Sequence, residues 1–123
     1  MSIIKDIYEF NDKVRGAKQP PKPTQLSPDD HIARAAFMGE EVLEFTEART
    51  PEEELDALID VIYFAVGGMY DLGLSVEQAH DAIRKVHAAN MSKVSGKKKG
   101  RSVATKDAAK PADWTEPDLG SYF

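Results

Sequence analysis

The chain has 123 residues, the length of one ordinary domain, so we expect a single domain over residues 1–123. It contains no cysteine, which excludes disulfides, thiolate nucleophiles and iron–sulfur clusters and leaves oxygen or imidazole as ligands for any metal. Charged residues make up 30% and apolar residues 41%, which favours helices with one hydrated face over a buried sheet. No apolar run reaches the length of a membrane span and the first residues show no signal pattern, so we expect a cytoplasmic protein without a membrane partner.

The net charge of −5 is divided unevenly along the chain. Residues 1–95 carry ten Lys/Arg against seventeen Asp/Glu, whereas residues 96–110 carry six Lys/Arg against one Asp. Carboxylates that hold metal ions and lysines that contact phosphate directly would together suit a polyphosphate, although a hydrated helical face and a basic tail explain the same charges. The basic segment is short and lacks interleaved aromatic residues, so we do not expect a nucleic-acid partner.

Apolar periodicity and helix-capping residues predict four helices in chain order. The first runs from Ser2 to about Arg15 and is followed by a proline-rich connection. The second starts after an N-cap at Ser27 and runs to about Ala48. These two elements have the lengths and stripes of amphipathic helices.

The third helix is the most strongly patterned element. It begins at a capping box formed by Thr50 and Glu53, and a Gly67-Gly68 pair in its interior indicates the close approach of a neighbouring helix. Its apolar stripe, which predicts a place in the core, comprises Leu55, Leu58, Ile59, Ile62, Val66 and Met69.

A fourth helix begins at a capping box of Ser75 and Gln78 and fades by Gly96. Beyond it, Gly, Lys, Pro and Asp dominate. The sequence therefore predicts an all-α bundle of about four helices, with a helical core over 1–95 and a basic, irregular C-terminal segment over 96–123.

Acidic side chains gather on the second and third helices. Glu40 and Glu44 are one turn apart with Glu41 beside them, and Asp56 and Asp60 are one turn apart on the next helix. The connection is short, so the helices are antiparallel neighbours that can turn these acids toward each other. Close carboxylates repel unless cations intervene, and carboxylates without thiolates are the ligands of Mg²⁺ or Mn²⁺. Hydrolysis of a phosphate ester is the natural chemistry of such a site.

A solvated acidic face is the alternative interpretation of these residues. Against it, the acids between Glu40 and Glu44 have no Lys or Arg four residues further on, the arrangement that supports an exposed acidic helix. Glu53 is interpreted as structural because its capping role accounts for it.

Two motifs carry a family resemblance, the segment Met38–Phe45 (MGEEVLEF) and the segment Glu54–Phe64 (ELDALIDVIYF). They resemble the all-α NTP pyrophosphohydrolase superfamily, which includes MazG, helical dUTPases and phosphoribosyl-ATP pyrophosphohydrolase. The superfamily pattern is EExxE on one helix and ExxD on the next. The chain matches the first half with Glu40, Glu41 and Glu44.

The second half departs from the pattern. If Asp60 is the family's aspartate, Ala57 stands where the glutamate is expected, and Asp56 supplies the missing carboxylate. A register that pairs Glu53 with Asp56 is the alternative. A non-catalytic helical module that binds nucleotides or a partner remains the alternative function if the change at Ala57 disables metal binding.

The segment Val86–Lys93 and the later residues Lys106, Lys110 and Trp114 are similar to small phage and bacterial MazG-like and HisE-like proteins. The resemblance implies a homodimer or homotetramer that uses Mg²⁺, with Mn²⁺ as a substitute. It also implies attack of a metal-activated water on the α-phosphorus of a (d)NTP, which releases a (d)NMP and pyrophosphate. Among pool nucleotides, dGTP or another purine is slightly favoured over dUTP and dCTP.

The resemblance also implies residue roles. Glu40 and Glu41 are the predicted catalytic residues that orient or deprotonate the water. Base contacts are expected from Ile7 and Phe10 or from Trp114. The predicted metal ligands are Glu40, Glu41, Glu44, Asp56 and Asp60, and the predicted phosphate contacts are Asn90, Lys93, Lys106 and Lys110.

Overall fold

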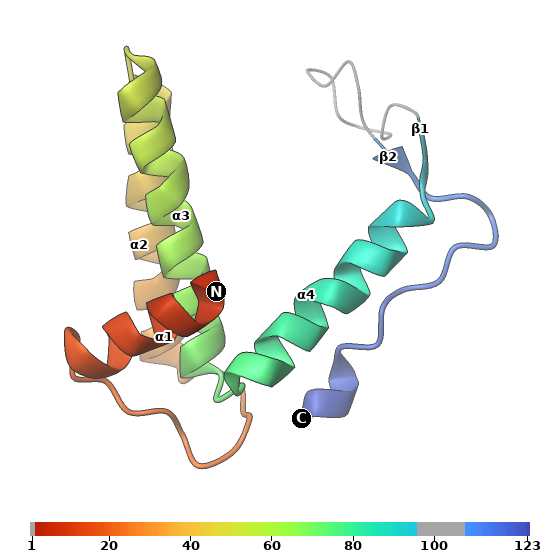
Figure 1. Cartoon of the computed structure of the whole chain (residues 1–123), viewed down its shortest axis with the longest axis horizontal. Coiled ribbons are helices and arrows are strands. Elements are labelled where there is room, and N and C mark those ends of the chain that lie inside the picture. Colours follow the sequence, from red (N-terminus) through yellow and green to blue (C-terminus); the bar gives the residue numbers. More distant parts are fainter. Residues whose placement is uncertain (1, 96–107) are drawn as a thin grey trace. The chain divides into compact units, whose positions relative to one another are not determined.

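The computed structural model describes residues 2–95 and 108–123. Its helices are α1 (Ile3–Lys13), α2 (Pro28–Glu47), α3 (Pro51–Asp71) and α4 (Val76–Met91) (Figure 1). The predicted all-α fold of four helices is confirmed, with helix ends within a few residues of those expected. Two features were not predicted, an antiparallel pair of two-residue strands, β1 (Val94–Ser95) with β2 (Ala108–Ala109), and a 3₁₀ helix, η1 (Gly120–Tyr122).

The chain divides into two compact units, each described by itself. The first unit contains Met1–Ala79 with Phe123, and the second contains His80–Tyr122. In the second unit, Tyr122 of η1 donates a hydrogen bond to Asp81 of α4, and the Lys85 ammonium lies 4.5 Å from the centre of the Tyr122 ring. The C-terminal segment is therefore attached to α4 through η1.

All four helices begin at a side-chain cap, Ser2 capping α1, and the caps of the other three were predicted. The Ser27 hydroxyl accepts a hydrogen bond from the Asp30 amide at 3.1 Å. The Thr50 hydroxyl accepts from the Glu53 amide at 3.2 Å while Glu53 accepts from the Arg49 amide at 3.1 Å. At α4 the cap is reciprocal: the Ser75 hydroxyl accepts from the Gln78 amide at 3.0 Å, and the Gln78 side chain accepts from the Ser75 amide at 2.9 Å. The predicted caps are confirmed, and each contributes about 1 kcal/mol to helix stability.

The core of the first unit lies where α1 crosses the C-terminal half of α3, while α2 runs beside α3 (Figure 1). The Tyr8 and Tyr70 rings meet edge to face at 5.2 Å, and the Tyr8 hydroxyl donates to the Leu74 carbonyl at 2.8 Å. The buried apolar residues are Ile4, Ile7, Tyr8, Ala57, Val66, Tyr70, Leu74 and Ala79.

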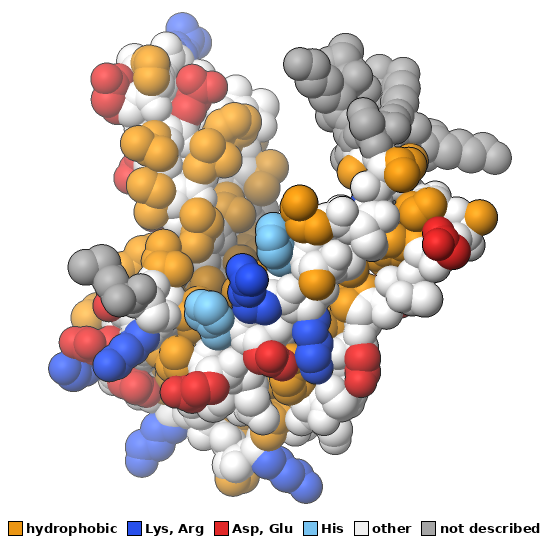
Figure 2. Space-filling view, turned by 45° about the vertical axis from the view of Figure 1, so that its right-hand side comes forward, with side chains coloured by type: hydrophobic (Ala, Val, Ile, Leu, Met, Phe, Trp, Pro, Cys, Tyr) orange, Lys and Arg blue, Asp and Glu red, His pale blue; other side chains and the backbone are white. Residues whose placement is uncertain are grey.

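The prediction that the apolar stripe of α3 lies in the core is wrong for most of its length. Val66 is 5% exposed, but Leu55 is 58% and Leu58 49% exposed. The reason is that the hairpin of α2 and α3 extends beyond α1, and no other element of the first unit covers this end. Apolar side chains lie along the hairpin in Figure 2. The exposed apolar residues of this part are Val42, Leu43, Phe45, Leu55, Leu58, Ile59 and Ile62.

None of the described helices is by itself long and apolar enough to cross a membrane. Only α3 and α4 together, as a bent pair, pass a test of length and composition, which core helices also pass.

The Gly67-Gly68 pair was predicted to admit a neighbouring helix, and the group that fills this space is the Arg34 side chain of α2. A Cβ atom at Gly67 would lie 2.8 Å from Arg34 Nη1, and one at Gly68 would lie 3.5 Å from Arg34 Cγ. The absence of side chains here therefore makes room for a buried arginine between α2 and α3.

Candidate metal centre and adjoining pocket

Three carboxylates meet between α2 and α3. Glu41, Glu44 and Asp60 each offer one oxygen, and these atoms lie within 4.8 Å of one another. Glu41 and Glu44 are three residues apart on one helix and therefore share a face. The antiparallel α3 places Asp60 opposite them. The structure thus brings together three of the five predicted metal ligands.

Glu41 is the most perturbed of these carboxylates. Its Oε2 atom is buried and has no hydrogen-bond partner within residues 2–95 and 108–123. Burial is the largest cause of a rise in its pKa to about 7, followed by the hydrogen bond with Glu44 and by the charges of Glu44, Asp60 and Asp56. The pKa of Asp60 is raised as well, by burial and then by the charges of Asp56 and Glu44. A divalent cation would give the orphaned oxygen a partner and offset the repulsion, so the residues present fit such an ion.

The two remaining predicted ligands lie outside this group of three. Glu40 is exposed, since a residue one position away points about 100° around the helix. Asp56 is exposed on α3 and borders a shallow hollow of about 320 Å³ with Glu44 and Glu53. The Glu53 carboxylate already caps α3. Ligand roles for Glu40 and Asp56 stay predictions.

The predicted phosphate contacts belong to the second unit, apart from Lys106, which lies outside the described residues. Lys93 and Lys110 place their ammonium groups 5.3 and 4.6 Å from the centre of the Trp114 ring. The Trp114 indole donates to the Ala89 carbonyl at 2.7 Å, which fixes the ring against α4. Asn90 is exposed in the last turn of α4. These roles stay predictions.

A pocket of about 510 Å³ adjoins the carboxylates and is lined in part by Glu41 and Asp60. Its aromatic walls are Phe10, Phe37, Tyr63 and Phe64. The rings of Phe37 and Phe64 stack at 5.4 Å, and those of Phe10 and Tyr63 meet edge to face at 5.5 Å. Phe10 lies in the pocket as expected for a base contact. The same prediction is wrong for Ile7, which is fully buried in the core because it lies on the inner face of α1.

Two arginines complete the pocket, and neither was predicted from the sequence as a site residue. Arg34, buried against the glycine pair of α3, forms an ion pair with Asp71 and donates to the Phe64 carbonyl at 3.3 Å. Arg15 donates to the Asn11 side chain and lies 3.8 Å from the same Asp71 carboxylate. The one available signal was a glycine pair on α3 facing a helix that carries a single arginine.

Residues 7–90 match the family model described as phosphoribosyl-ATP pyrophosphohydrolase. The match covers the hairpin, the three carboxylates and the whole pocket. The chain belongs to the phosphoribosyl-ATP pyrophosphohydrolase family. This family is part of the all-α NTP pyrophosphohydrolase superfamily, so the predicted resemblance is confirmed. A comparison with the curated proteins finds no match.

Members of the phosphoribosyl-ATP pyrophosphohydrolase family are typically metal-dependent nucleotide pyrophosphohydrolases, which agrees with the acidic cluster.

Glu41 of this member is predicted to make the stability of the metal-free protein depend on pH. The folded-state pKa of about 7 lies above the ordinary 4.5. Between pH 4.5 and about 7 the folded protein therefore holds a proton on Glu41 that the unfolded chain lacks. The stability that Glu41 contributes is fully present below pH 4.5 and is lost as the pH rises through about 7. In chelator, Glu41→Gln should melt above the wild type at pH 8, and the difference should shrink toward pH 5. Thermal unfolding across this range tests it, and a pH-independent difference would contradict the assignment.

Proposed function

We propose that the chain is a Mg²⁺-dependent nucleoside triphosphate pyrophosphohydrolase, with Mn²⁺ able to substitute, that converts a (d)NTP and water into a (d)NMP and pyrophosphate. The observation that carries the proposal is the buried, unpartnered Oε2 atom of Glu41, which belongs to a carboxylate cluster at an aromatic pocket. The cluster supplies hard oxygens for a divalent cation. The pocket supplies flat apolar walls for a base. Side by side, the two features suit a nucleotide whose phosphates lie at the carboxylates.

The proposed roles rest on the acidic cluster and on the family resemblance. Glu41, Glu44 and Asp60 would hold the cation, with Asp56 beside them and Glu40 at the exposed edge. Bound Mg²⁺ would supply positive charge against the charge that develops on the phosphates and would favour ionisation of water. Glu40 or Glu41 would orient the attacking water and take its proton. Asn90, Lys93, Lys106 and Lys110 would contact the triphosphate.

The substrate is proposed to be a nucleotide of the cytoplasmic pool, with dGTP or another purine (d)NTP favoured over dUTP and dCTP. Four aromatic side chains and a volume of about 510 Å³ support binding of a base. Phosphoribosyl-ATP, named in the family description, is the second candidate. It would be cleaved by the same chemistry, since its triphosphate also yields a monophosphate and pyrophosphate.

Product analysis tests the proposal. The purified protein is incubated with Mg²⁺ and, in turn, dGTP, dATP, dCTP, dUTP, GTP and phosphoribosyl-ATP. Monophosphate with pyrophosphate, lost on adding chelator, is the outcome we expect. Release of diphosphate and inorganic phosphate would contradict cleavage at the α-phosphorus. Survival of every triphosphate with both Mg²⁺ and Mn²⁺ would favour the non-catalytic module.

The exposed apolar end of the hairpin supports a second proposal, that the chain forms a homodimer or homotetramer. A contiguous apolar patch of this kind marks a contact surface. We predict a solution mass of two or four chains by light scattering. Ile59→Glu, in the patch at 42% exposed, should lower that mass, whereas Val14→Glu, 70% exposed at the C-cap of α1, should leave it unchanged. A monomeric wild-type protein would contradict the proposal.

A further inference from the structure

The pocket is ordered along the hairpin. On α2, Arg34, Phe37 and Glu41 recur at the spacing of one helical face. Arg34 and Glu41 are two turns apart, about 10 Å along the axis at 1.5 Å per residue. The antiparallel α3 repeats this order, with Asp60 beside the carboxylates and Asp71 beside Arg34. A fitting ligand therefore has an anionic, metal-binding end, a flat ring in the middle and hydrogen-bond acceptors at the far end.

At the far end, Arg34 and Arg15 differ in how far their donors are already used. Arg34 is 8% exposed and both of its terminal nitrogens are engaged, by Asp71 and by the Phe64 carbonyl. Arg15 is 37% exposed, and its contacts to described residues use Nη1 alone. Two guanidinium groups share the Asp71 carboxylate, while the Asp12 carboxylate nearby accepts a hydrogen bond from the Tyr70 hydroxyl. Arg15 is therefore the group with donors left for a ligand.

We propose that Arg15 is the specificity-determining residue of the pocket and selects purine nucleotides with an oxygen at C6, that is guanine or hypoxanthine. The inference rests on the proposed function and names its substrate class. A guanidinium can donate two parallel hydrogen bonds to O6 and N7 of such a base. Adenine turns its 6-amino donor toward the same guanidinium, so the N–H donor that faces this amino group is left without an acceptor. A pyrimidine offers one carbonyl in place of the O6 and N7 pair.

A phosphate at Arg15 is the competing interpretation, and the layout disfavours it. The aromatic walls lie between Arg15 and the carboxylate end, where a metal would hold the phosphates. A polyphosphate that reached Arg15 would have to lie along the rings of Phe37 and Phe64, which offer no donor. A base on those walls leaves its polar edge at Arg15.

The test compares kcat/KM for dGTP, dITP and dATP in the wild type, Arg15→Gln and Arg15→Lys. We expect the wild type to prefer dGTP and dITP over dATP by roughly ten- to a hundredfold, the discrimination of one bidentate contact. Arg15→Gln should remove the preference by slowing dGTP and dITP while dATP changes little. Arg15→Lys keeps the charge but loses the two parallel N–H donors of the guanidinium, so most of the preference for dGTP and dITP over dATP should be lost. Comparing dITP with dGTP separates the 6-oxo group from the 2-amino group.

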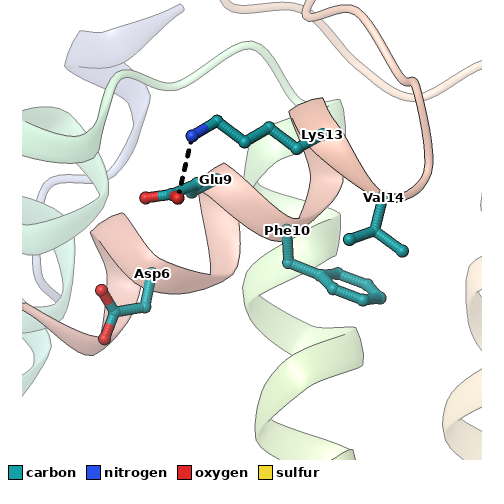
Figure 3. Close-up of a pocket in the computed structure, with 5 residues that line it drawn as sticks. All are labelled: Asp6, Glu9, Phe10, Lys13 and Val14. Carbon is teal, nitrogen blue, oxygen red and sulfur yellow. Dashed lines mark hydrogen bonds and ion pairs between the residues drawn. The ribbon is translucent and has the colours of Figure 1, made fainter.

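Lys13→Gln is the matched control, a charge removed from the same end of α1 but outside the pocket. Figure 3 shows a different hollow, lined in part by Lys13 and Glu9, in which Lys13 reaches back to Glu9 and away from the Phe10 ring; the two charged groups pair at 3.0 Å. This variant should keep the wild-type preference. If Arg15→Gln slows dATP as much as dGTP, or if the wild type shows no 6-oxo preference, the proposal is overturned.

A binding measurement separates failure of this inference from failure of the proposed function. Calorimetry with dGMP and dAMP needs no turnover, so it reports on Arg15 even in a protein that hydrolyses nothing. Tighter binding of dGMP than dAMP, lost in Arg15→Gln, supports the assignment. Equal binding of both by the wild type overturns it, whatever the outcome of the product analysis.

Discussion

Replacing Glu41 by glutamine is expected to lower kcat/KM at least about a hundredfold. Changing even a group that only hydrogen-bonds a metal ligand lowers metal affinity or activity about ten- to a hundredfold. The substitution keeps the size of the side chain but removes its charge and exchanges one carboxylate oxygen for an amide nitrogen. Glu41 Oε2 has no hydrogen-bond partner among the described residues, so the substitution changes an oxygen that is available to a cation. Steady-state kinetics with the best substrate of the product panel, together with Mg²⁺ titration, measure the effect.

Glu52→Gln is the control for this variant. Glu52 is an exposed acid in the first turn of α3, outside the carboxylate cluster. It should retain wild-type activity, and both variants should keep the helical signal in far-ultraviolet circular dichroism. Near wild-type turnover by Glu41→Gln would remove Glu41 from the ligand set and leave the cluster without a demonstrated role.

Local rules predicted the helices of this chain. Ser27, Thr50 and Ser75 cap helices through their own side chains, within three residues of the groups they bind. Such signals need no tertiary contact, which is why the expected and observed ends agree closely. The pairing of β1 with β2 joins Val94 to Ala109, fifteen residues further along the chain, and two-residue strands leave no local pattern in the sequence.

Apolar periodicity predicted which face of α3 avoids water, but not what covers it. Val66 lies against the core of the first unit, whereas Leu55 and Leu58 continue the same stripe into an exposed region. A repeating apolar pattern has the same form whether the face packs inside one chain or against another. The distinction depends on how far α1 reaches along the hairpin, which no spacing within α3 encodes.

The residues of the candidate site also differ in whether local spacing in the sequence could predict them. Glu41, Glu44 and Asp60 could be predicted together because helical spacing and a short connection fix their positions. Arg15 and Arg34 could not, because their partner Asp71 is distant in sequence and meets them only after three helices pack. The signal that survives in the sequence is indirect, namely the glycines that leave room for the arginine.

Gly73→Ala is the substitution expected to cost the most stability, about 2–4 kcal/mol of unfolding free energy from left-handed backbone strain combined with steric overlap. Gly73 has φ +81°, a conformation that glycine adopts without cost, and it terminates α3. A Cβ atom there would lie 2.6 Å from the Lys22 carbonyl oxygen and 2.8 Å from Pro20 Cγ.

The overlap cannot be relieved by a small side-chain shift, because the segment that contains Lys22 is attached to the end of α3. Gln19 donates to the carbonyls of Tyr70 and Leu74 at 3.0 and 2.7 Å, and the Thr24 amide donates to the Leu72 carbonyl at 2.8 Å. Moving the backbone away from a new methyl group would break these bonds. The loop that closes the first unit would therefore loosen along with the core beneath it.

Gly16→Ala separates the two causes. Gly16 also has positive φ, +62°, but a Cβ atom there would meet no atom within 4 Å. It should lose only the conformational part, about 1–2 kcal/mol. Urea unfolding of both variants at one pH and one protein concentration gives the comparison, with concentration held fixed because association would add to the apparent stability. Equal losses would mean that the segment around Lys22 yields freely and does not hold the end of α3 in place.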